Sequence, residues 1–447
     1  MKVSIKKLSV LLIFALIISM VGCADSPHPT GQKPSDVEST QATEQRPNNN
    51  EDNQITDIEN LEAGAFSTGN WSTDFGTTFG EGGYYYCGSF QTSKNATSRT
   101  CFVDLSNGVS VFLCSKVGCP HVSKDGKKVD DCEAAFGSNN EPFFVRNGGI
   151  YYTESWRGDG CEYLCYRDST GQAARDIAVL GEPYVSSEHS LSVFNYILVG
   201  DLMYYEVSVG KRIFTGPNEA TVQDALCAIM RVDLSSGKQE VLFELPAEWS
   251  FSFIAAREDA VLLKGMRQPT ELDFSAEDFR DQLVKLPTCI LQWTEADGKV
   301  TSLMTSTIEK LSSVDKFHDG IIYCIGYYDQ TYSTLDLSTG KTAETALPSC
   351  IFLGEKYILY YEDNSFRIMD IQKGEDIPLE IENAGFNVSD VGSEGVILEK
   401  FYYKEGTDPD AVMKDIDRTV TCYVRFDSLS DGLQEEDCLD FHTHQNR

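Results

Sequence analysis

Two short patterns alternate seven times along the chain, and this repetition constrains the fold more than any other feature of the sequence. The first is a turn containing Gly or an acid that leads into an aromatic or aliphatic run. Runs of this kind, bounded by turn residues, predict short β-strands. The seven copies are Gly82–Tyr86, Gly149–Tyr152, Gly200–Tyr205, Glu258–Leu263, Asp319–Tyr323, Gly354–Tyr360 and Ser393–Leu398.

The second pattern is a strand end that carries an acid, followed by a short polar turn closed by Gly. Because Gly accepts the positive φ that tight hairpin loops require, each copy predicts a β-hairpin. We interpret the acid as an acceptor for backbone N–H groups of the loop, not as a catalytic carboxylate. The seven copies are Val103–Gly108, Arg167–Gly171, Val232–Gly237, Trp293–Gly298, Leu335–Gly340, Met369–Gly374 and Phe426–Gly432.

The fixed order of the two patterns, at irregular spacings of roughly 34 to 66 residues, predicts an all-β fold. Strand, strand, hairpin turn, strand is the order that a β-propeller of four-stranded blades would show, with about seven blades. A pair of β-sandwiches is the alternative, since sandwiches also contain many short strands. Short helical insertions are expected as well, the clearest at Ser275–Pro287, where Ser275 is a candidate N-cap.

The first residues of the chain predict export from the cytoplasm. Lys2, Lys6 and Lys7 precede an apolar run from Val10 to Val21. A charged segment followed by an apolar one is typical of a signal peptide. The run is well short of the ~20 residues that a transmembrane helix needs. We therefore assign residues 1–22 to a signal peptide.

Met20-Val21-Gly22-Cys23 resembles the lipobox at which bacteria attach diacylglycerol to a cysteine and cleave before it. Met20 departs from the usual Leu, but Gly22 directly before the cysteine fits. The resemblance implies lipidation of Cys23 and a location on the extracytoplasmic face of the cell membrane. An ordinary secretory signal with a chance cysteine is the alternative.

Composition divides the remaining chain into a stalk and a folded part. Residues 23–62 are rich in Pro, Ser, Thr, Gln, Asn and acids and contain no aromatic residue. Such a segment cannot bury enough apolar surface to offset the entropy lost on ordering, so it predicts a disordered stalk. Aromatic residues become frequent from Phe66 onward. Residues 63–447 are therefore assigned to the propeller-like domain.

Charge argues against nucleic acid as a partner. The chain has 37 Lys+Arg and 69 Asp+Glu, a net charge of −32. Loss of the signal peptide removes three lysines and leaves a net charge of −35. Binding to phosphates needs a basic surface, which this composition does not offer.

Cysteines form the strongest local cluster. Cys114, Cys119, His121 and Cys132 lie within nineteen residues and match the donor set of a Cys₃His zinc site, although the spacing is not that of a standard finger. The alternatives are a disulfide, Cys119–Cys132 or Cys114–Cys132, or simple free thiols. Fourteen cysteines minus the lipidated one leave an odd number, so complete pairing within the chain is impossible. Each of these alternatives is structural, not catalytic.

The segment around this cluster also carries a family resemblance. The run from Val103 to Ala134, with Cys114, Cys119-Pro120-His121 and Cys132 in it, resembles a motif of uncharacterised lipoproteins of anaerobic Gram-positive bacteria. In that family the motif lies near the start of a β-propeller-like domain. The resemblance implies fold and location, and it brings no activity with it.

No catalytic motif is present in the sequence. It contains no Gly-x-Ser-x-Gly, no phosphate-binding glycine loop, no His-Glu-x-x-His and no EF-hand loop. We therefore predict a non-enzymatic, cell-surface propeller that binds a protein or glycan ligand, with Trp71, Trp156 and Trp249 as natural contacts. The alternatives are a glycan-active extracellular enzyme on a propeller scaffold, and an envelope sensor or assembly subunit.

Overall fold

The computed structural model describes residues 54–91, 96–122, 132–136, 143–155, 157, 161–186, 189–216, 219–269, 272, 276–350, 352–354, 356–362, 365–379, 384–404 and 416–445. The chain divides into two units, Met1–Arg46 and Pro47–Arg447, and every described residue belongs to the second. The predicted signal peptide and Cys23 lie outside the described residues.

Each blade is a four-stranded antiparallel sheet made of four consecutive strands. Blade 1 contains β1 (Phe79–Gly80), β2 (Gly83–Gln91), β3 (Ala96–Asp104) and β4 (Val109–Phe112). Blade 2 contains β5 (Phe143–Arg146), β6 (Gly149–Glu154), β7 (Glu162–Asp168) and β8 (Arg175–Leu180). Blade 3 contains β9 (His189–Val199), β10 (Leu202–Gly216), β11 (Glu219–Asp233) and β12 (Gln239–Pro246).

Four further blades complete the described chain. Blade 4 contains β13 (Trp249–Arg257), β14 (Ala260–Arg267), β15 (Pro287–Thr294) and β16 (Lys299–Thr307). Blade 5 contains β17 (Ser313–His318), β18 (Ile321–Ile325), β19 (Thr331–Asp336) and β20 (Lys341–Pro348). Blade 6 contains β21 (Phe352–Leu353), β22 (Tyr357–Glu362), β23 (Ser365–Asp370) and β24 (Glu375–Ile377). Blade 7 contains β25 (Ala384–Val391), β26 (Gly395–Tyr403), β27 (Ile416–Arg425) and β28 (Cys438–Gln445).

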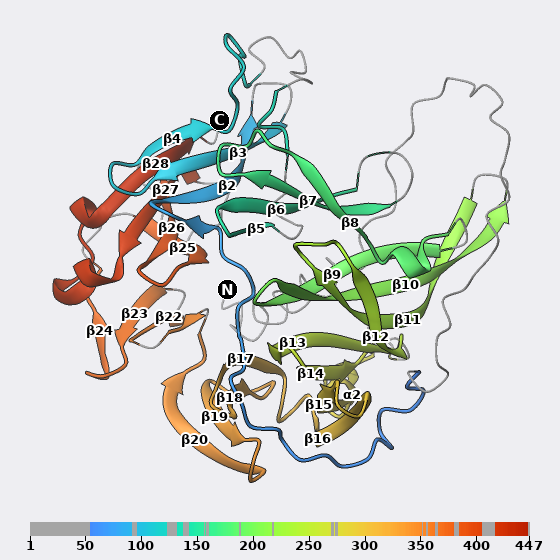
Figure 1. Ribbon diagram of the computed structural model, residues 1–447. Coiled ribbons are helices and arrows are strands. Elements are labelled where there is room, and N and C mark those ends of the chain that lie inside the picture. Colours follow the sequence, from blue (N-terminus) through green and yellow to red (C-terminus); the bar gives the residue numbers. More distant parts are fainter. Residues whose placement is uncertain are drawn as a thin grey trace, which may run out of the picture. The chain divides into compact units, whose positions relative to one another are not determined.

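The blades form a ring in chain order (Figure 1). Neighbouring blades touch through strand pairs that include β1 with β5, β9 with β13, β13 with β17 and β17 with β21, and β28 of the last blade contacts β4 of the first. The protein is therefore a seven-bladed β-propeller, as the sequence predicted. Blade 6 fits into one of the short repeats because its edge strands have only two and three residues.

Seven hydrophobic clusters fill the seven seams between neighbouring blades, including the seam between blades 7 and 1. The sequence of β10 shows how one strand serves two seams. Met203 and Tyr205 pack toward blade 2, whereas Tyr204 packs toward blade 4. Successive side chains of a strand point to opposite faces. A strand with a blade on each side is therefore apolar at consecutive positions, which explains the apolar runs of the first pattern.

The acids of the second pattern are structural, as predicted. In five hairpins the acid accepts a backbone N–H two residues ahead at 2.8 to 3.0 Å, as Asp233 does from Ser235. The closing glycine has a positive φ between 64° and 78° in six copies, for example Gly340. Residues with a side chain rarely adopt this conformation, so the turn requires glycine there.

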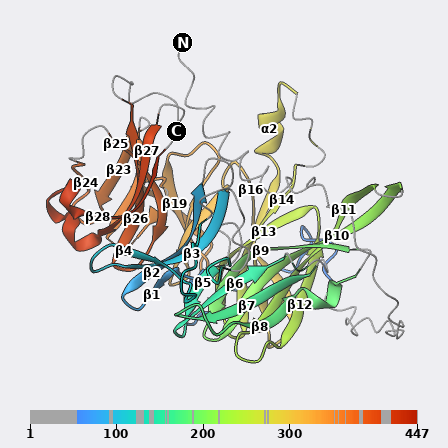
Figure 2. The ribbon, with the colours of Figure 1, turned by 90° about the horizontal axis from the view of Figure 1, so that it is seen from above.

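The two ends of the propeller differ. Antiparallel strands alternate in direction, so the links between the first and second strands, and between the third and fourth, lie at one end, the turn face. These links have two to six residues, except the one between β27 and β28. The opposite end, the loop face, carries the second-to-third links and the links between blades. Among them are residues 113–142 and 268–286, and α2 (Phe279–Leu283) projects beyond the sheets in Figure 2.

Residues Gln54–Thr78, here called the strap, run over blades 3 and 4 and into the middle of the ring (Figure 1). Ile55 donates its N–H to the Glu244 carbonyl at 3.0 Å, and Ile58 is only 2% exposed. The folded region therefore begins earlier than residue 63, where the sequence placed it. Ile55, Ile58 and Leu61 supply the apolar contacts that overcome the polar composition of this segment.

Two further expectations are corrected by the structure. The helix expected at Ser275–Pro287 is shorter, since α2 covers only Phe279–Leu283 and Pro287 already begins β15. Trp249 is buried in the seam between blades 3 and 4, so it is not a ligand contact. Trp156 lies outside the described residues. None of the helices in the described part has the length and apolar character that crossing a lipid bilayer requires.

Candidate metal centre

Cys114, Cys119, His121 and Cys132 come together on the loop face, in the link between blades 1 and 2. Each offers one ligand atom, and these four atoms all lie within 4.8 Å of one another. The Sγ atom of Cys132 is 3.7 Å from Nδ1 of His121. The prediction that these four residues form one cluster is therefore confirmed, and the cluster can hold a metal ion.

A tight turn brings the first two cysteines together. The backbone N–H of Cys119 donates to the Lys116 carbonyl at 3.1 Å, which reverses the chain between the two thiols. Gly118 has a φ of 76°, a conformation that costs little only for glycine. The following Pro120 restricts the chain before His121, which itself has a positive φ of 52°.

Backbone N–H groups surround the sulfur atoms. Burial alone would raise the pKa of the Cys114 thiol, but N–H groups of Lys116 and Glu133 donate to its sulfur and lower the pKa below its ordinary value. Burial raises the pKa of the Cys132 thiol to about 11, although the Ala134 N–H opposes this effect. N–H donors directed at sulfur stabilise the thiolate form, which is the form that binds metals.

Two residues of blade 1 hold His121 in place. The imidazole stacks on Phe112 with ring centroids 4.8 Å apart, and Arg99 donates from Nε to the His121 carbonyl at 2.7 Å. Arg99 is a buried residue of β3. Neither partner could be identified from the sequence, because both belong to strands that precede the cluster and look like ordinary sheet residues.

The donor set favours a thiophilic metal. Three thiols and one imidazole provide the sulfur and nitrogen ligands of structural zinc sites, which are usually tetrahedral. The carboxylate of Glu133, which follows Cys132 in the chain, is bonded to Ser115: its Oε2 accepts from the Ser115 N–H at 2.9 Å and from the Ser115 hydroxyl at 2.8 Å. With four protein ligands the site would leave no open position for a substrate. The arrangement is thus that of a structural centre, not a catalytic one.

The strap closes the middle of the ring at the turn face. Ser72 pairs with Ala256 of β13, and Asp74 pairs with Leu198 of β9. Arg146, at the end of β5, forms an ion pair with Asp74 at 2.8 Å. The strap thereby joins blades 2, 3 and 4 around the axis.

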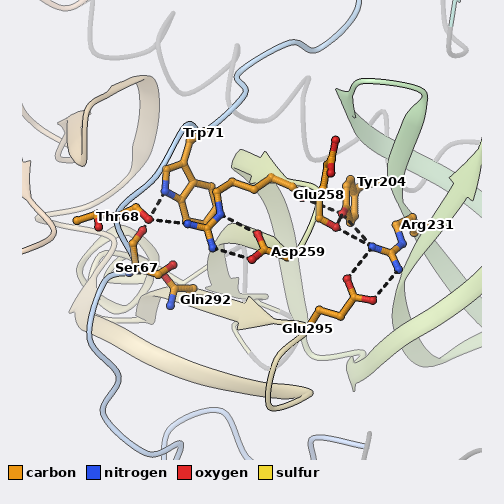
Figure 3. Close-up of polar contacts among 10 residues, drawn as sticks. Ser67, Thr68, Trp71, Tyr204, Arg231, Glu258, Asp259, Gln292 and Glu295 are labelled. Atoms are coloured by element: carbon orange, nitrogen blue, oxygen red, sulfur yellow. Dashed lines mark hydrogen bonds and ion pairs between the residues drawn. The ribbon is translucent and has the colours of Figure 1, made fainter.

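Arg257 binds the strap where it turns toward the axis, beside Thr68, Trp71 and Asp259, which Figure 3 labels. Its Nη1 donates to the Thr68 carbonyl at 2.6 Å, and its guanidinium lies 5.0 Å from the centre of the Trp71 ring. Its Nε also pairs with Asp259 at 2.9 Å. Trp71 further packs on Phe317 of blade 5, with centroids 6.2 Å apart. Trp71, expected as a ligand contact, is thus a packing residue.

A cavity of about 410 Å³ lies at the seam between blades 3 and 4. Arg231 lies in its wall and is paired with Glu240 and with Glu295, the latter at 3.2 Å, and it donates to the Glu258 carbonyl at 2.8 Å (Figure 3). Arg231 therefore links blades 3 and 4 across the seam at this cavity. The lining residues are Leu202, Arg231, Asp233, Lys238, Gln239, Glu240, Glu258, Asp259 and Glu295.

Glu206 is a buried carboxyl that the sequence did not single out. It lies inside the seam between blades 3 and 4, where Asn195 donates to its Oε2 at 2.9 Å and the Cys227 thiol to its Oε1 at 3.3 Å. Burial raises its pKa from 4.5 to about 7, against the lowering effect of these two donors. The residue does not line the cavity described above.

No protein-family model and no curated protein matches the chain. Among solved structures, it is similar to the β-propeller domain of the Trilobed protease from Pyrococcus furiosus, with 12% identity, a TM-score of 0.40, and coverage of 79% of this chain and 95% of that one. TolB from Acinetobacter baumannii shows 13% identity and a TM-score of 0.33, with coverage of 78% and 77%. Oligogalacturonate lyase from Vibrio parahaemolyticus shows 11% identity and a TM-score of 0.32, with coverage of 70% and 92%.

These likenesses decide nothing about activity, because identities and TM-scores are low. The assignment of the propeller rests on the seven sheets themselves.

Proposed function

We propose that the protein is an extracytoplasmic lipoprotein, held at the membrane by lipid on Cys23, whose propeller binds a protein partner through its loop face. The observation that carries this proposal is the difference between the two ends of the ring. One end has short hairpin turns and is crossed by the strap, and the other has the long links.

The strap covers the turn face near the axis, although Phe75 of the strap is itself 47% exposed. Apart from the link between β27 and β28, the links of this face are short, and the strap contacts the first strands of blades 2, 3, 4, 5 and 7 near the axis. The last of these contacts is a hydrogen bond from the Thr78 hydroxyl to Asp390. A ligand approaching the axis from this end would have to displace those backbone and side-chain contacts.

The loop face presents large exposed side chains. Tyr328, in the link between β18 and β19, is 54% exposed, and Tyr361, near the end of β22, is 46% exposed. Val117, at the tip of the turn in the metal centre, is fully exposed. Tyrosine is enriched at protein interfaces because it combines a large apolar ring with a polar tip. We therefore place the partner against blades 5 and 6 and the link between blades 1 and 2.

Site-specific photo-crosslinking in cells tests the face. A photoreactive amino acid replaces Tyr328 on the loop face, and the matched control replaces Asp319 on the turn face, whose side chain is 87% exposed. We expect one defined protein adduct from position 328 and none from position 319. Adducts from position 319 alone would mean that the partner binds the turn face, which would contradict the proposal. If position 328 gives no protein adduct but is crosslinked to cell-wall glycan, the result would favour a glycan ligand instead.

Lipid attachment has its own test. Cells are fed an alkyne-tagged fatty acid, and the protein is isolated and examined for the tag. We expect labelling of the native chain and none of Cys23→Ser, which should also leave the membrane fraction. Labelling that persists in Cys23→Ser would contradict the assignment of this residue.

We also propose that the metal held by Cys114, Cys119, His121 and Cys132 is zinc. The four donors support a tetrahedral site, and thiolate ligands favour zinc over calcium or magnesium. Cobalt(II) substitution tests the geometry, since tetrahedral cobalt with thiolate ligands absorbs strongly in the visible and near ultraviolet. We expect that spectrum from the native chain and its loss in His121→Ala. A weak, octahedral-type spectrum would contradict the proposal.

A further inference from the structure

The segment that follows the last candidate ligand, Cys132 to Phe136, lies in the seam between blades 1 and 2. Cys132, Ala134 and Phe136 are 5%, 0% and 7% exposed. The Phe136 ring lies 5.0 Å from the Tyr152 ring of β6, and the Arg167 guanidinium of β7 covers it at 4.4 Å. The segment therefore fills the seam from the side of blade 2.

The same segment is bonded to blade 1. The N–H of Thr100 donates to the Ala134 carbonyl at 2.8 Å, and its hydroxyl donates to the Phe136 carbonyl. The carbonyl of Thr100 accepts from Leu113, just before the metal centre, at 3.1 Å. Residues 134–136 thus continue the edge of the sheet where β4 stops.

Blade 1 needs this support more than its neighbours. Its first strand, β1, has two residues, and its last strand, β4, has four. Short strands provide few ladder hydrogen bonds and little apolar surface for a seam. The residues on both sides of the segment, 123–131 and 137–142, lie outside the described part of the chain. Among the described contacts, the ligand cluster and the Ser115–Glu133 hydrogen bonds connect the segment to the turn at Cys114–His121.

We propose that the metal at this centre is the lock of the seam between blades 1 and 2, holding Cys132–Phe136 against Thr100 so that this seam stays closed. This proposal rests on the zinc site proposed above. Metal bound by Cys132 together with Cys114, Cys119 and His121 ties the segment to the edge of blade 1. Without it, the segment is free to leave the seam while the other six seams persist.

Hydrogen exchange followed by mass spectrometry tests the lock on the full chain, with zinc and after chelation. Local opening is reported by amides of the affected region alone. We expect chelation to speed exchange of the Thr100 amide by about tenfold or more, while the amides of β14 and β15 in blade 4 keep their rates. Equal rates at Thr100 in the two forms, with zinc stoichiometrically bound in one of them, would overturn the lock and leave the zinc site standing. Failure to bind zinc at all would overturn the zinc site first.

Three variants separate the metal from the packing. His121→Ala should lose zinc and speed exchange at Thr100. Phe136→Ala should keep zinc and still speed that exchange, because the seam loses its filling. His121→Cys, which retains four ligands, should restore both zinc and slow exchange. Should His121→Ala fail to fold, His121→Cys decides the matter: fast exchange at Thr100 despite bound zinc would overturn the proposal.

Discussion

Ser72 and Ala256 exchange two backbone hydrogen bonds, 2.7 Å from the Ser72 N–H to the Ala256 carbonyl and 2.9 Å in return. Through this pair the strap is bonded to the first strand of blade 4 in an isolated antiparallel β-bridge. Every blade is made of four strands that are consecutive in the sequence, so no blade combines a strand from the start of the chain with strands from its end. The ring is instead held closed by the contacts of the strap and by the packing between blades 7 and 1.

Ser72→Pro should therefore loosen the strap. Proline removes the N–H that bonds to Ala256, and we expect a loss of about 1 to 3 kcal/mol in the free energy of unfolding. Hydrogen exchange at Ala256 should become faster as well. Ser72→Ala is the control, because it keeps both backbone bonds and loses only the two hydroxyl contacts, to the Leu198 carbonyl and from the Asp74 N–H. An equal loss in the two variants would show that the backbone pairing contributes nothing.

Tyr204→Phe removes one hydroxyl from the seam between blades 3 and 4. Tyr204 is fully buried, and its one O–H hydrogen is shared between the carbonyls of Arg257 and Glu258, each 2.8 Å from the hydroxyl oxygen. Removing the hydroxyl takes this donor from the Arg257 carbonyl, whereas the Glu258 carbonyl still accepts from Arg231. The loss should cost about 1 to 2 kcal/mol in chemical denaturation. Tyr328→Phe is the matched control on an exposed ring and should change stability by less than about 0.5 kcal/mol. Similar effects at both positions would contradict the role given to Tyr204.

Glu206 should make stability fall as the pH rises. In the unfolded chain its carboxyl ionises near pH 4.5, whereas in the folded chain it stays protonated up to about pH 7. The folded state binds the extra proton between these values, so its stability decreases across this window and levels off above it. The shift corresponds to about 2 to 4 kcal/mol.

Glu206→Gln cannot ionise and should remove that decrease. Urea unfolding at pH 4.5 and pH 8 is the measurement, with the exposed Glu394→Gln as the control. Relative to the native chain, Glu206→Gln should gain stability at pH 8 but not at pH 4.5. An unchanged dependence on pH in Glu206→Gln would mean that Glu206 is ionised in the folded protein at pH 5 to 6.

The turn acids can be tested at Asp370, whose side chain is buried. Its Oδ1 accepts from the N–H groups of Gln372 and Lys373 at 2.9 and 3.1 Å. Asp370→Ala leaves both donors without that acceptor, and we expect a loss of about 1 to 2 kcal/mol in the free energy of unfolding. Asp370→Asn keeps an acceptor oxygen and should lose less. If Asp370→Asn lost as much free energy of unfolding as Asp370→Ala or more, the charge of the carboxylate would matter more than its acceptor oxygen.

The blades could be predicted from the sequence because their signal is local. A turn such as Asp336 to Gly340 and a run such as Leu202 to Tyr205 each report their structure within a few residues. The strap could not be predicted in this way. Its three aliphatic residues, Ile55, Ile58 and Leu61, are diluted by polar neighbours, and they are buried only because blades 3 and 4 provide a surface for them.

The metal centre was predictable in part for a similar reason. Cys114, Cys119, His121 and Cys132 are close in the chain, so their types and spacing suggest a common site. Their supports come from elsewhere in space, as Arg99 does, and a strand residue gives no sign in sequence of the loop it will meet. The choice between metal and disulfide depends on the chemical state of the sulfur atoms and stays a prediction.

Metal content, measured together with intact mass on protein purified without reductant or chelator, shows whether Cys114, Cys119, His121 and Cys132 hold zinc. One zinc ion per chain should be present, lost in Cys119→Ser and His121→Ala but retained in Cys161→Ser, a cysteine outside the cluster. A chain without metal, lighter by two hydrogen atoms and linked between Cys119 and Cys132, would contradict the zinc centre and make the cluster a disulfide staple.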